Sequence, residues 1–213
     1  MQAQGSPADM VQVSNEINYG LLWSEGKTPN WDNLAALLKS GSEAVKACHR
    51  PTAVLLHLVE GGDTAGARHW FNHVMARDVP FDLIGLSHCT YCHGSLADLQ
   101  YNLNDITARY QKDVVIVETA YPFTLAEADS QKNVVHSASQ LTYGYAATEA
   151  GQAAMLRDMM TVVRAVPNGR AWASSTGSQP GQPCPVTAGI QRILLRAMSG
   201  RTKRSSILTI ARP

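Results

Sequence analysis

Short apolar runs alternate with longer amphipathic stretches over roughly the first 166 residues of the chain. The apolar runs are rich in Val, Ile and Leu, which is typical of parallel strands buried on both faces. They predict strands at residues 10–16, 54–58, 81–87 and 114–118. The amphipathic stretches have helical spacing and predict helices at residues 31–48, from about 64 to 77, 95–110 and 148–166, with Ser95 as an N-cap.

A regular alternation of strands and helices predicts an α/β fold with a parallel sheet. Four such units are too few to close a barrel, which takes about eight strands. Periodicity alone leaves two architectures open, an open doubly wound sheet and part of a (β/α)8 barrel. The polar stretch at residues 119–147 is longer than most structural connections, which suggests that it serves a functional site.

The distribution of charge divides the chain into two regions. The net charge is +1, but residues 1–170 hold 12 basic and 17 acidic residues, whereas residues 171–213 hold six basic residues and no acidic one. We therefore expect a folded domain at 1–170 and a poorly structured basic tail at 171–213. A basic arm for nucleic acid is one reading of such a tail. We favour an interpretation in which the tail has no function, and we expect no nucleic-acid partner.

Neither a signal peptide nor a membrane segment is predicted. The first five residues are polar and lack an apolar signal region. No apolar run approaches the roughly 20 residues that cross a bilayer. We therefore expect no membrane partner.

One C-x-x-C motif, Cys89 to Cys92, stands among the four cysteines. Such a motif is consistent with half of a zinc site or with a redox pair. No second pair with zinc spacing follows, and Cys48 and His49 would add ligands only if the fold brought them close.

Two glutamates, Glu16 and Glu118, end predicted strands. In a barrel of alternating strands and helices, catalytic groups sit where the strands end. Two carboxylates on one rim are typical of a glycosidase, in which one is the acid/base and the other the nucleophile. The alternative is structural, because a glutamate at a strand end also caps helices or binds backbone amides. Asn15, beside Glu16, could hydrogen-bond a sugar hydroxyl.

Rings and imidazoles near these strand ends are candidate sugar contacts. Aromatic rings stack on sugar faces and histidines bond hydroxyls, although each such side chain is individually more often part of the packing. The candidates are Tyr19, Trp23, His57, Tyr91, His93 and Tyr121.

Several segments resemble glycoside hydrolase family 53, the arabinogalactan endo-β-1,4-galactanases. The sequence V-Q-V-S-N-E-I-N-Y-G-L-L-W at residues 11–23 resembles the family's acid/base segment. Residues 82–87, 93–99 and 117–122 match further family segments in the same order. The resemblance covers about residues 4–170.

The resemblance implies a partial (β/α)8 barrel that holds strands four to seven and lacks strands one to three and a proper strand eight. It implies retaining endo-hydrolysis of β-1,4-galactan or arabinogalactan, with Glu16 as acid/base and Glu118 as nucleophile. It places Asn15 at the sugar next to the cleaved bond, implies a secreted enzyme and requires no cofactor. The alternative is an inactive remnant of that family.

Some positions depart from the family pattern. Residues 88–94 read H-C-T-Y-C-H-G where the family has Tyr-Tyr-Pro-Tyr-Trp-His-Gly. Ser14 stands where the family usually has Gly, and Ser24 where it usually has Pro. Residues 125–133 resemble the bacterial calcium loop, and Asp129 and Asn133 offer oxygen ligands that suit Ca²⁺. A solvated polar loop is the alternative.

The tail has an explanation that needs no function. After Gly169 and Arg170 the family continues with its eighth strand, and one nucleotide string encodes both that strand and this tail when read from its second base. We therefore interpret residues 171–213 as an out-of-frame translation.

Overall fold

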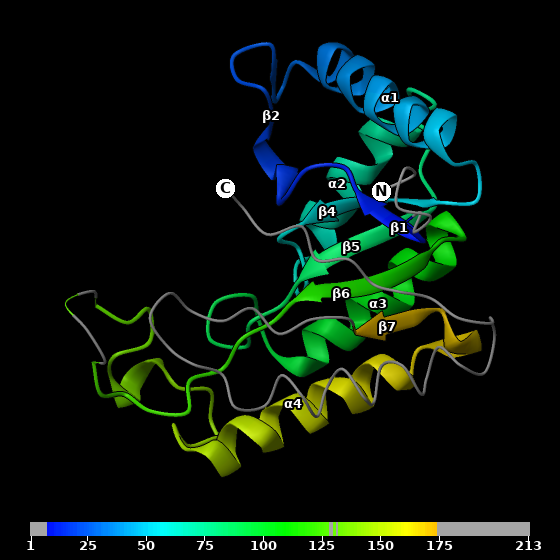
Figure 1. Cartoon of the computed structure of the whole chain (residues 1–213). Helices are drawn as coiled ribbons and strands as arrows, with labels where there is room; N and C mark the ends of the chain where they lie inside the picture. Colours follow the sequence, from blue (N-terminus) through cyan, green and yellow to red (C-terminus); the bar gives the residue numbers. More distant parts are fainter. Residues whose placement is uncertain (1–7, 128–129, 131, 174–213) are drawn as a thin grey trace.

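The computed structural model describes residues 8–127, 130 and 132–173 (Figure 1). Its centre is a five-stranded sheet in the order β1-β4-β5-β6-β7, and every pair of neighbouring strands is parallel. The prediction of a parallel α/β architecture is therefore confirmed. The strands are β1 (Met10–Gln12), β4 (Ala53–Leu58), β5 (Leu83–Ser87), β6 (Asp113–Glu118) and β7 (Ala171–Ala173).

Four long helices connect and cover these strands. They are α1 (Trp31–Cys48), α2 (Thr64–Met75), α3 (Leu96–Tyr110) and α4 (Glu149–Arg164). Short 3-10 turns, η2 (Ile17–Tyr19), η3 (Ala138–Gln140) and η4 (Pro167–Gly169), lie in the connections. Among the described residues, no helix is long and apolar enough to cross a membrane.

The two faces of the sheet bury different side chains because alternate residues of a strand point to opposite faces. On the helix-covered face, Leu56, Ile84 and Ile116 join a large core with apolar residues of all four long helices. On the other face, Leu55, Leu83 and Val115 form a small second cluster with Trp172 of β7 packed against it. This division suits a sheet whose inner face lines the inside of a barrel.

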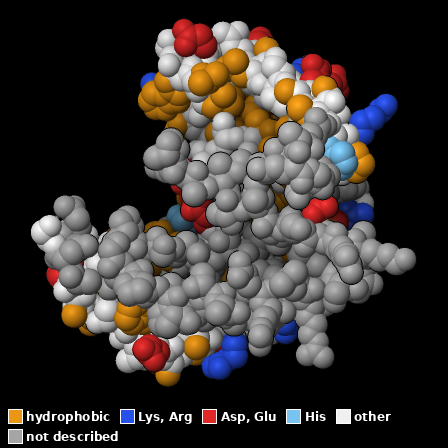
Figure 2. Space-filling view, in the orientation of Figure 1, with side chains coloured by type: hydrophobic (Ala, Val, Ile, Leu, Met, Phe, Trp, Pro, Cys, Tyr) orange, Lys and Arg blue, Asp and Glu red, His pale blue; other side chains and the backbone are white. Residues whose placement is uncertain are grey.

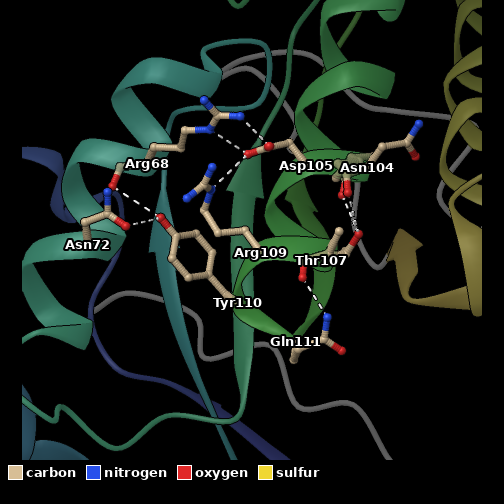
Figure 3. Close-up of polar contacts among 10 residues, drawn as sticks. Arg68, Asn72, Asn104, Asp105, Thr107, Arg109, Tyr110 and Gln111 are labelled. Carbon is tan, nitrogen blue, oxygen red and sulfur yellow. Dashed lines mark hydrogen bonds and ion pairs between the residues drawn. The ribbon is translucent and has the colours of Figure 1, made fainter.

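Helices α2 and α3 are joined by a polar clamp at the surface (Figure 3). Arg68 Nε donates to Asp105 Oδ2 at 2.8 Å, and the second guanidinium nitrogen pairs with the other carboxylate oxygen. The Tyr110 hydroxyl donates to Asn72 Oδ1 at 2.8 Å. These bonds fix the helices that carry the connections after β4 and β5.

The first strand is shorter than predicted. The apolar run suggested residues 10–16, but pairing with β4 ends at Gln12. Ser14 and Glu16 then have positive φ angles of 70° and 47°, which turn the chain out of the extended conformation. Glu16 therefore stands in a turn beyond the strand rather than on it.

A fifth strand lies just beyond the predicted boundary at residue 170. Ala171–Ala173 form β7, which pairs in parallel with Val114–Ile116 of β6. The first three residues of the predicted tail thus complete a fifth strand. Residues 174–213, on which the rest of the out-of-frame interpretation falls, lie outside the described residues.

A small antiparallel hairpin, β2 (Gly20–Leu21) and β3 (Gly26–Lys27), stands apart from the sheet. The turn between its strands exposes Leu22 and Trp23, which are 66% and 62% accessible. Figure 2 shows hydrophobic side chains gathered over the hairpin and α1, above a hollow that has acidic and histidine side chains at its base.

Candidate active site

Three predicted residues converge at the carboxyl ends of the parallel strands. Glu16 follows β1, His57 lies near the end of β4, and Glu118 ends β6. One carboxylate oxygen of each glutamate and one ring nitrogen of His57 lie within 4.8 Å of one another. Parallel strands place their carboxyl ends along one edge, which explains how residues 102 positions apart meet.

The turn that carries Glu16 is followed directly by η2, which anchors it. Ile17 is 2% exposed and packs into the main core. Its carbonyl accepts a 3.0 Å hydrogen bond from the indole N–H of Trp70 in α2. Burial of Ile17 and this bond fix the backbone immediately after Glu16, so the carboxylate stands on a rigid support.

A hydrogen-bonded chain leads from the strand ends to Glu16. Ser87, the last residue of β5, donates from Oγ to Glu16 Oε1 at 2.6 Å. The Ser87 oxygen lies 2.9 Å from His57 Nε2. When the one hydroxyl proton of Ser87 is given to Glu16, the matching tautomer of His57 carries its proton on Nε2 and donates to Ser87.

The other side of His57 completes the chain. Nδ1 lies 3.1 Å from both the Gln12 side-chain amide nitrogen and Asn15 Oδ1. With the proton on Nε2, Nδ1 accepts from Gln12. The same amide nitrogen donates to Asn15 Oδ1 at 3.0 Å. In this arrangement Gln12 donates to His57, His57 donates to Ser87 and Ser87 donates to Glu16, while Gln12 also holds Asn15 beside the chain.

His57 itself is fully buried, with 0% exposure. Burial lowers the pKa of His57 to about 4, against the raising effect of the Glu16 charge. The ring is therefore neutral near pH 7. The sequence suggested His57 as a sugar contact, but the structure places it beneath Glu16, where it contacts Ser87 instead.

Comparisons with known proteins bear on the family and the fold. The sequence profile of glycosyl hydrolase family 53 matches residues 1–174. The chain belongs to this family. The predicted resemblance is thereby confirmed, and the five parallel strands are part of a (β/α)8 barrel.

Individual family members show the extent of the match. An uncharacterized protein of Niallia circulans is 40% identical over 169 residues, which are 76% of this chain and 46% of that protein. Arabinogalactan endo-β-1,4-galactanase A of Aspergillus niger is 32% identical over 169 residues, 76% of this chain and 47% of that protein. The chain thus spans about half the length of the curated relatives that it matches.

A solved structure supports the fold directly. The catalytic domain of the family 53 enzyme from Ignisphaera aggregans superposes with a TM-score of 0.74 and 30% identity, covering 81% of this chain and 49% of that domain. Most of this chain therefore superposes on a catalytic domain of the same family.

The aromatic residues predicted as sugar contacts fall into two groups. Tyr19 and Trp23 are 72% and 62% exposed, and the Trp23 indole N–H donates to the Tyr19 carbonyl at 3.1 Å. The Lys27 ammonium lies 4.4 Å from the Trp23 ring centre. The hairpin thus presents open rings in a fixed orientation.

Tyr121 differs from the prediction. It is 4% exposed, and its hydroxyl donates to the Tyr145 carbonyl at 2.8 Å and accepts from the Thr142 N–H at 3.1 Å. Its ring therefore holds the 119–147 loop instead of offering a face for a sugar. Tyr91, 6.4 Å away between ring centres, is half-buried.

Sequence reasoning missed Ser87, Asn18 and Glu60. Asn18 Nδ2 donates to Glu60 Oε1 at 2.5 Å, and Asn18 Oδ1 accepts from the Val59 N–H at 2.9 Å. Burial, with a smaller effect of Asp63, raises the pKa of Glu60. Ser87 ends β5 and Glu60 closely follows β4, so the strand-end argument used for Glu16 and Glu118 could have identified both.

The C-x-x-C motif lies in the loop after β5. The backbone N–H groups of Cys92 and His93 donate to the Cys89 carbonyl at 3.0 and 2.8 Å, which closes a helical turn. A hydrogen bond from Cys92 lowers the pKa of Cys89 to about 5 and raises that of Cys92. Cys48 and His49, considered as additional ligands, are not part of this cluster.

The possible calcium loop is only partly described. Asp129 lies outside the described residues. The Asn133 side-chain amide donates to the Ala126 carbonyl at 3.0 Å, and its backbone N–H donates to Glu127 Oε2 at 2.8 Å. These two bonds close a turn within the loop. Calcium binding stays a prediction.

Proposed function

We propose that this chain carries the catalytic carboxylates of a retaining endo-β-1,4-galactanase acting on galactan or arabinogalactan. The observation that carries the proposal is the approach of the Glu16 and Glu118 carboxylates to within 4.8 Å. Retaining glycosidases keep their carboxyl groups about 5–5.5 Å apart, whereas inverting enzymes need about 6.5–9.5 Å to admit a water. Membership of family 53 and the galactanase relatives supply the substrate class.

The hydrogen-bonded chain supports Glu16 as the acid/base. Because Ser87 occupies Oε1 of Glu16, a proton on this carboxyl group resides on Oε2. That oxygen is then the one available to protonate the leaving glycosidic oxygen. Neutral His57 fixes the direction of the Ser87 hydroxyl and adds no competing positive charge.

Glu118 then has the nucleophile's role. Its carboxylate attacks the anomeric carbon while Glu16 gives its proton to the departing oxygen, which yields a glycosyl-enzyme ester and a shortened chain. In the second step Glu16 takes a proton from water, and the resulting hydroxide displaces Glu118 from the sugar. Two inversions leave the anomeric configuration unchanged.

Asn15 and the hairpin supply contacts for the polymer. Asn15 is exposed beside Glu16 with its oxygen already engaged by Gln12, so its amide N–H group is the part that remains for a sugar hydroxyl. Trp23 offers an exposed ring on the turn of the hairpin. His93 and Tyr91 lie on the loop after β5 and remain candidate contacts. Because the proposed substrate is a polysaccharide, we infer that the enzyme acts outside the cell.

The test is release of reducing sugar from β-1,4-galactan by the purified chain. We expect release by the unmodified chain and a loss of at least 1000-fold in Glu118→Gln and Glu16→Gln. Glu43→Gln, on the exposed surface of α1, is the matched control and should keep full activity. With an aryl β-galactoside whose leaving group departs without protonation, azide should restore turnover to Glu16→Ala and form a β-galactosyl azide, because azide can attack the glycosyl-enzyme without a general base.

Two results would overturn the proposal. Galactan hydrolysis that survives Glu118→Gln would remove the nucleophile assignment. A folded chain that releases no sugar would favour the inactive-remnant alternative.

A further inference from the structure

The loop after β5 holds a cluster of three soft and borderline metal ligands. The sulfur atoms of Cys89 and Cys92 and a ring nitrogen of His93 lie within 4.8 Å of one another. The two thiols are not joined in a disulfide. The catalytic proposal uses neither cysteine, so this chemistry is unassigned.

The spacing of the ligand atoms is close to that of a zinc site. With Zn–S bonds of about 2.3 Å and Zn–N bonds of about 2.0 Å, tetrahedral geometry separates ligand atoms by about 3.5–3.8 Å. The three ligand atoms lie within 4.8 Å of one another, so the longest separation exceeds the tetrahedral value by about 1 Å. Rotation of the side chains can close that difference.

The backbone of this loop is held in place from several directions. The His88 N–H donates to the Glu118 carbonyl at 2.9 Å, and the Thr142 hydroxyl donates to Thr90 Oγ1 at 2.8 Å. Ser95 and Asp98 form a capping box that begins α3. The His93 carbonyl packs so closely on Gly62 that a Cβ there would come within 2.0 Å of it. The ligands thus start from a preformed turn.

His93 already makes a bond that a metal would replace. The backbone N–H of Cys89 donates to His93 Nδ1 at 2.9 Å, so the ring presents a lone pair toward the cysteine turn. A metal ion bound to Nδ1 takes the place of this N–H. Cys92 is exposed, which gives an ion a path from solvent and leaves room for a water as fourth ligand.

We propose that Cys89, Cys92 and His93 bind one zinc ion, or a similar soft divalent ion such as Co²⁺ or Cd²⁺, with solvent in the fourth position. Two thiolates and one imidazole bind these ions in preference to Ca²⁺ and Mg²⁺. A redox pair is the competing role for a C-x-x-C motif, but it does not use the third donor, His93. The site does not depend on galactan hydrolysis.

The test is titration of the untagged, fully reduced and metal-stripped chain with Co²⁺. We expect one equivalent to give thiolate-to-cobalt charge-transfer absorption and the intense d–d bands of a four-coordinate ion, and Zn²⁺ to abolish both. Cys89→Ser and Cys92→Ser should each weaken binding at least 100-fold, and His93→Ala at least tenfold. Circular dichroism shows whether each variant is folded.

A double variant, Cys48→Ser with Cys184→Ser, is the matched control because it removes the other two cysteines of the chain. It should bind Co²⁺ with unchanged affinity. Loss of binding in this control, or retention of binding in both Cys89→Ser and Cys92→Ser, would overturn the proposal. So would a reduced chain that takes up no ion but rapidly forms a Cys89–Cys92 disulfide with oxidised glutathione, which would establish the redox pair.

Discussion

The hydroxyl of Ser87 lies 2.6 Å from Oε1 of Glu16 and donates its proton to that carboxylate. Ser87 is 1% exposed, so this bond is made from a buried and fixed position. Hydrogen bonds to a charged group contribute about 1.5–3 kcal/mol. The contact therefore makes Ser87 a positioning residue for the proposed acid/base.

Replacing Ser87 with alanine should lower kcat on galactan by roughly 10–100-fold with little change in KM, because the lost bond orients Glu16 and does not hold the sugar. Ser87→Thr keeps the hydroxyl and should recover most of the loss. Steady-state kinetics of both variants gives the comparison. A rise in KM at unchanged kcat would show that Ser87 serves substrate binding instead.

Stability should fall as the pH drops from about 6.5 to about 4, because His57 is buried in neutral form. The folded pKa of about 4 lies below the unfolded value of about 6.5, so the unfolded state binds more protons in this window. The contribution is full above pH 6.5, is lost progressively down to pH 4, and amounts to at most about 3–4 kcal/mol.

Urea unfolding at several pH values measures this effect. Burial also lowers the pKa of His88 to about 4, so His57→Gln should remove one part of the acid sensitivity and His88→Gln another. His136→Gln, on the exposed surface, is the control and should leave the slope unchanged. An identical pH slope in His57→Gln and the unmodified chain would contradict the prediction.

Asp105→Asn should destabilise the chain by about 1 kcal/mol at pH 7, because it breaks the two-bond clamp from Arg68. The hydrogen bond from Arg68 lowers the pKa of Asp105. The clamp's contribution is therefore present above the ordinary carboxyl pKa and is lost as the pH falls below it.

Asp32→Asn provides the matched control, because Asp32 also pairs with an arginine but its side chain is 85% exposed, against 17% for Asp105. Its loss should change the free energy of unfolding by only a few tenths of a kcal/mol. Equal losses in the two variants would show that burial does not set the strength of the clamp.

Ser14→Gly should stabilise the chain by up to about 1 kcal/mol, because Ser14 has a φ of 70°, where residues with a Cβ are strained. The melting temperature measures the gain. Ser40→Gly, within α1, is the control and should destabilise by about 0.5–1 kcal/mol, since glycine is unfavourable inside helices. A loss of stability in Ser14→Gly would show that its side chain makes a compensating contact.

Local pattern alone predicted much of the framework. The helix expected at residues 31–48 is α1 with the same limits, and Ser95 is the N-cap of α3 as expected. Helical spacing and caps depend on neighbouring residues, so they can be recognised in the sequence. Glu16 and Glu118 were found for a similar reason, because the end of an apolar strand marks the edge where active sites form.

The sequence by itself determined the order of strands and helices, the family and the two candidate carboxylates. Only the tertiary structure decided that His57 and Tyr121 are buried, that Ser87 donates to Glu16, and that His93 turns toward the two cysteines. The physical reason is that exposure and hydrogen-bond partners depend on segments distant in the chain. His57 is a strand-end histidine in the sequence, and only the packing of β1 and β5 on either side of β4 makes it a buried, neutral donor.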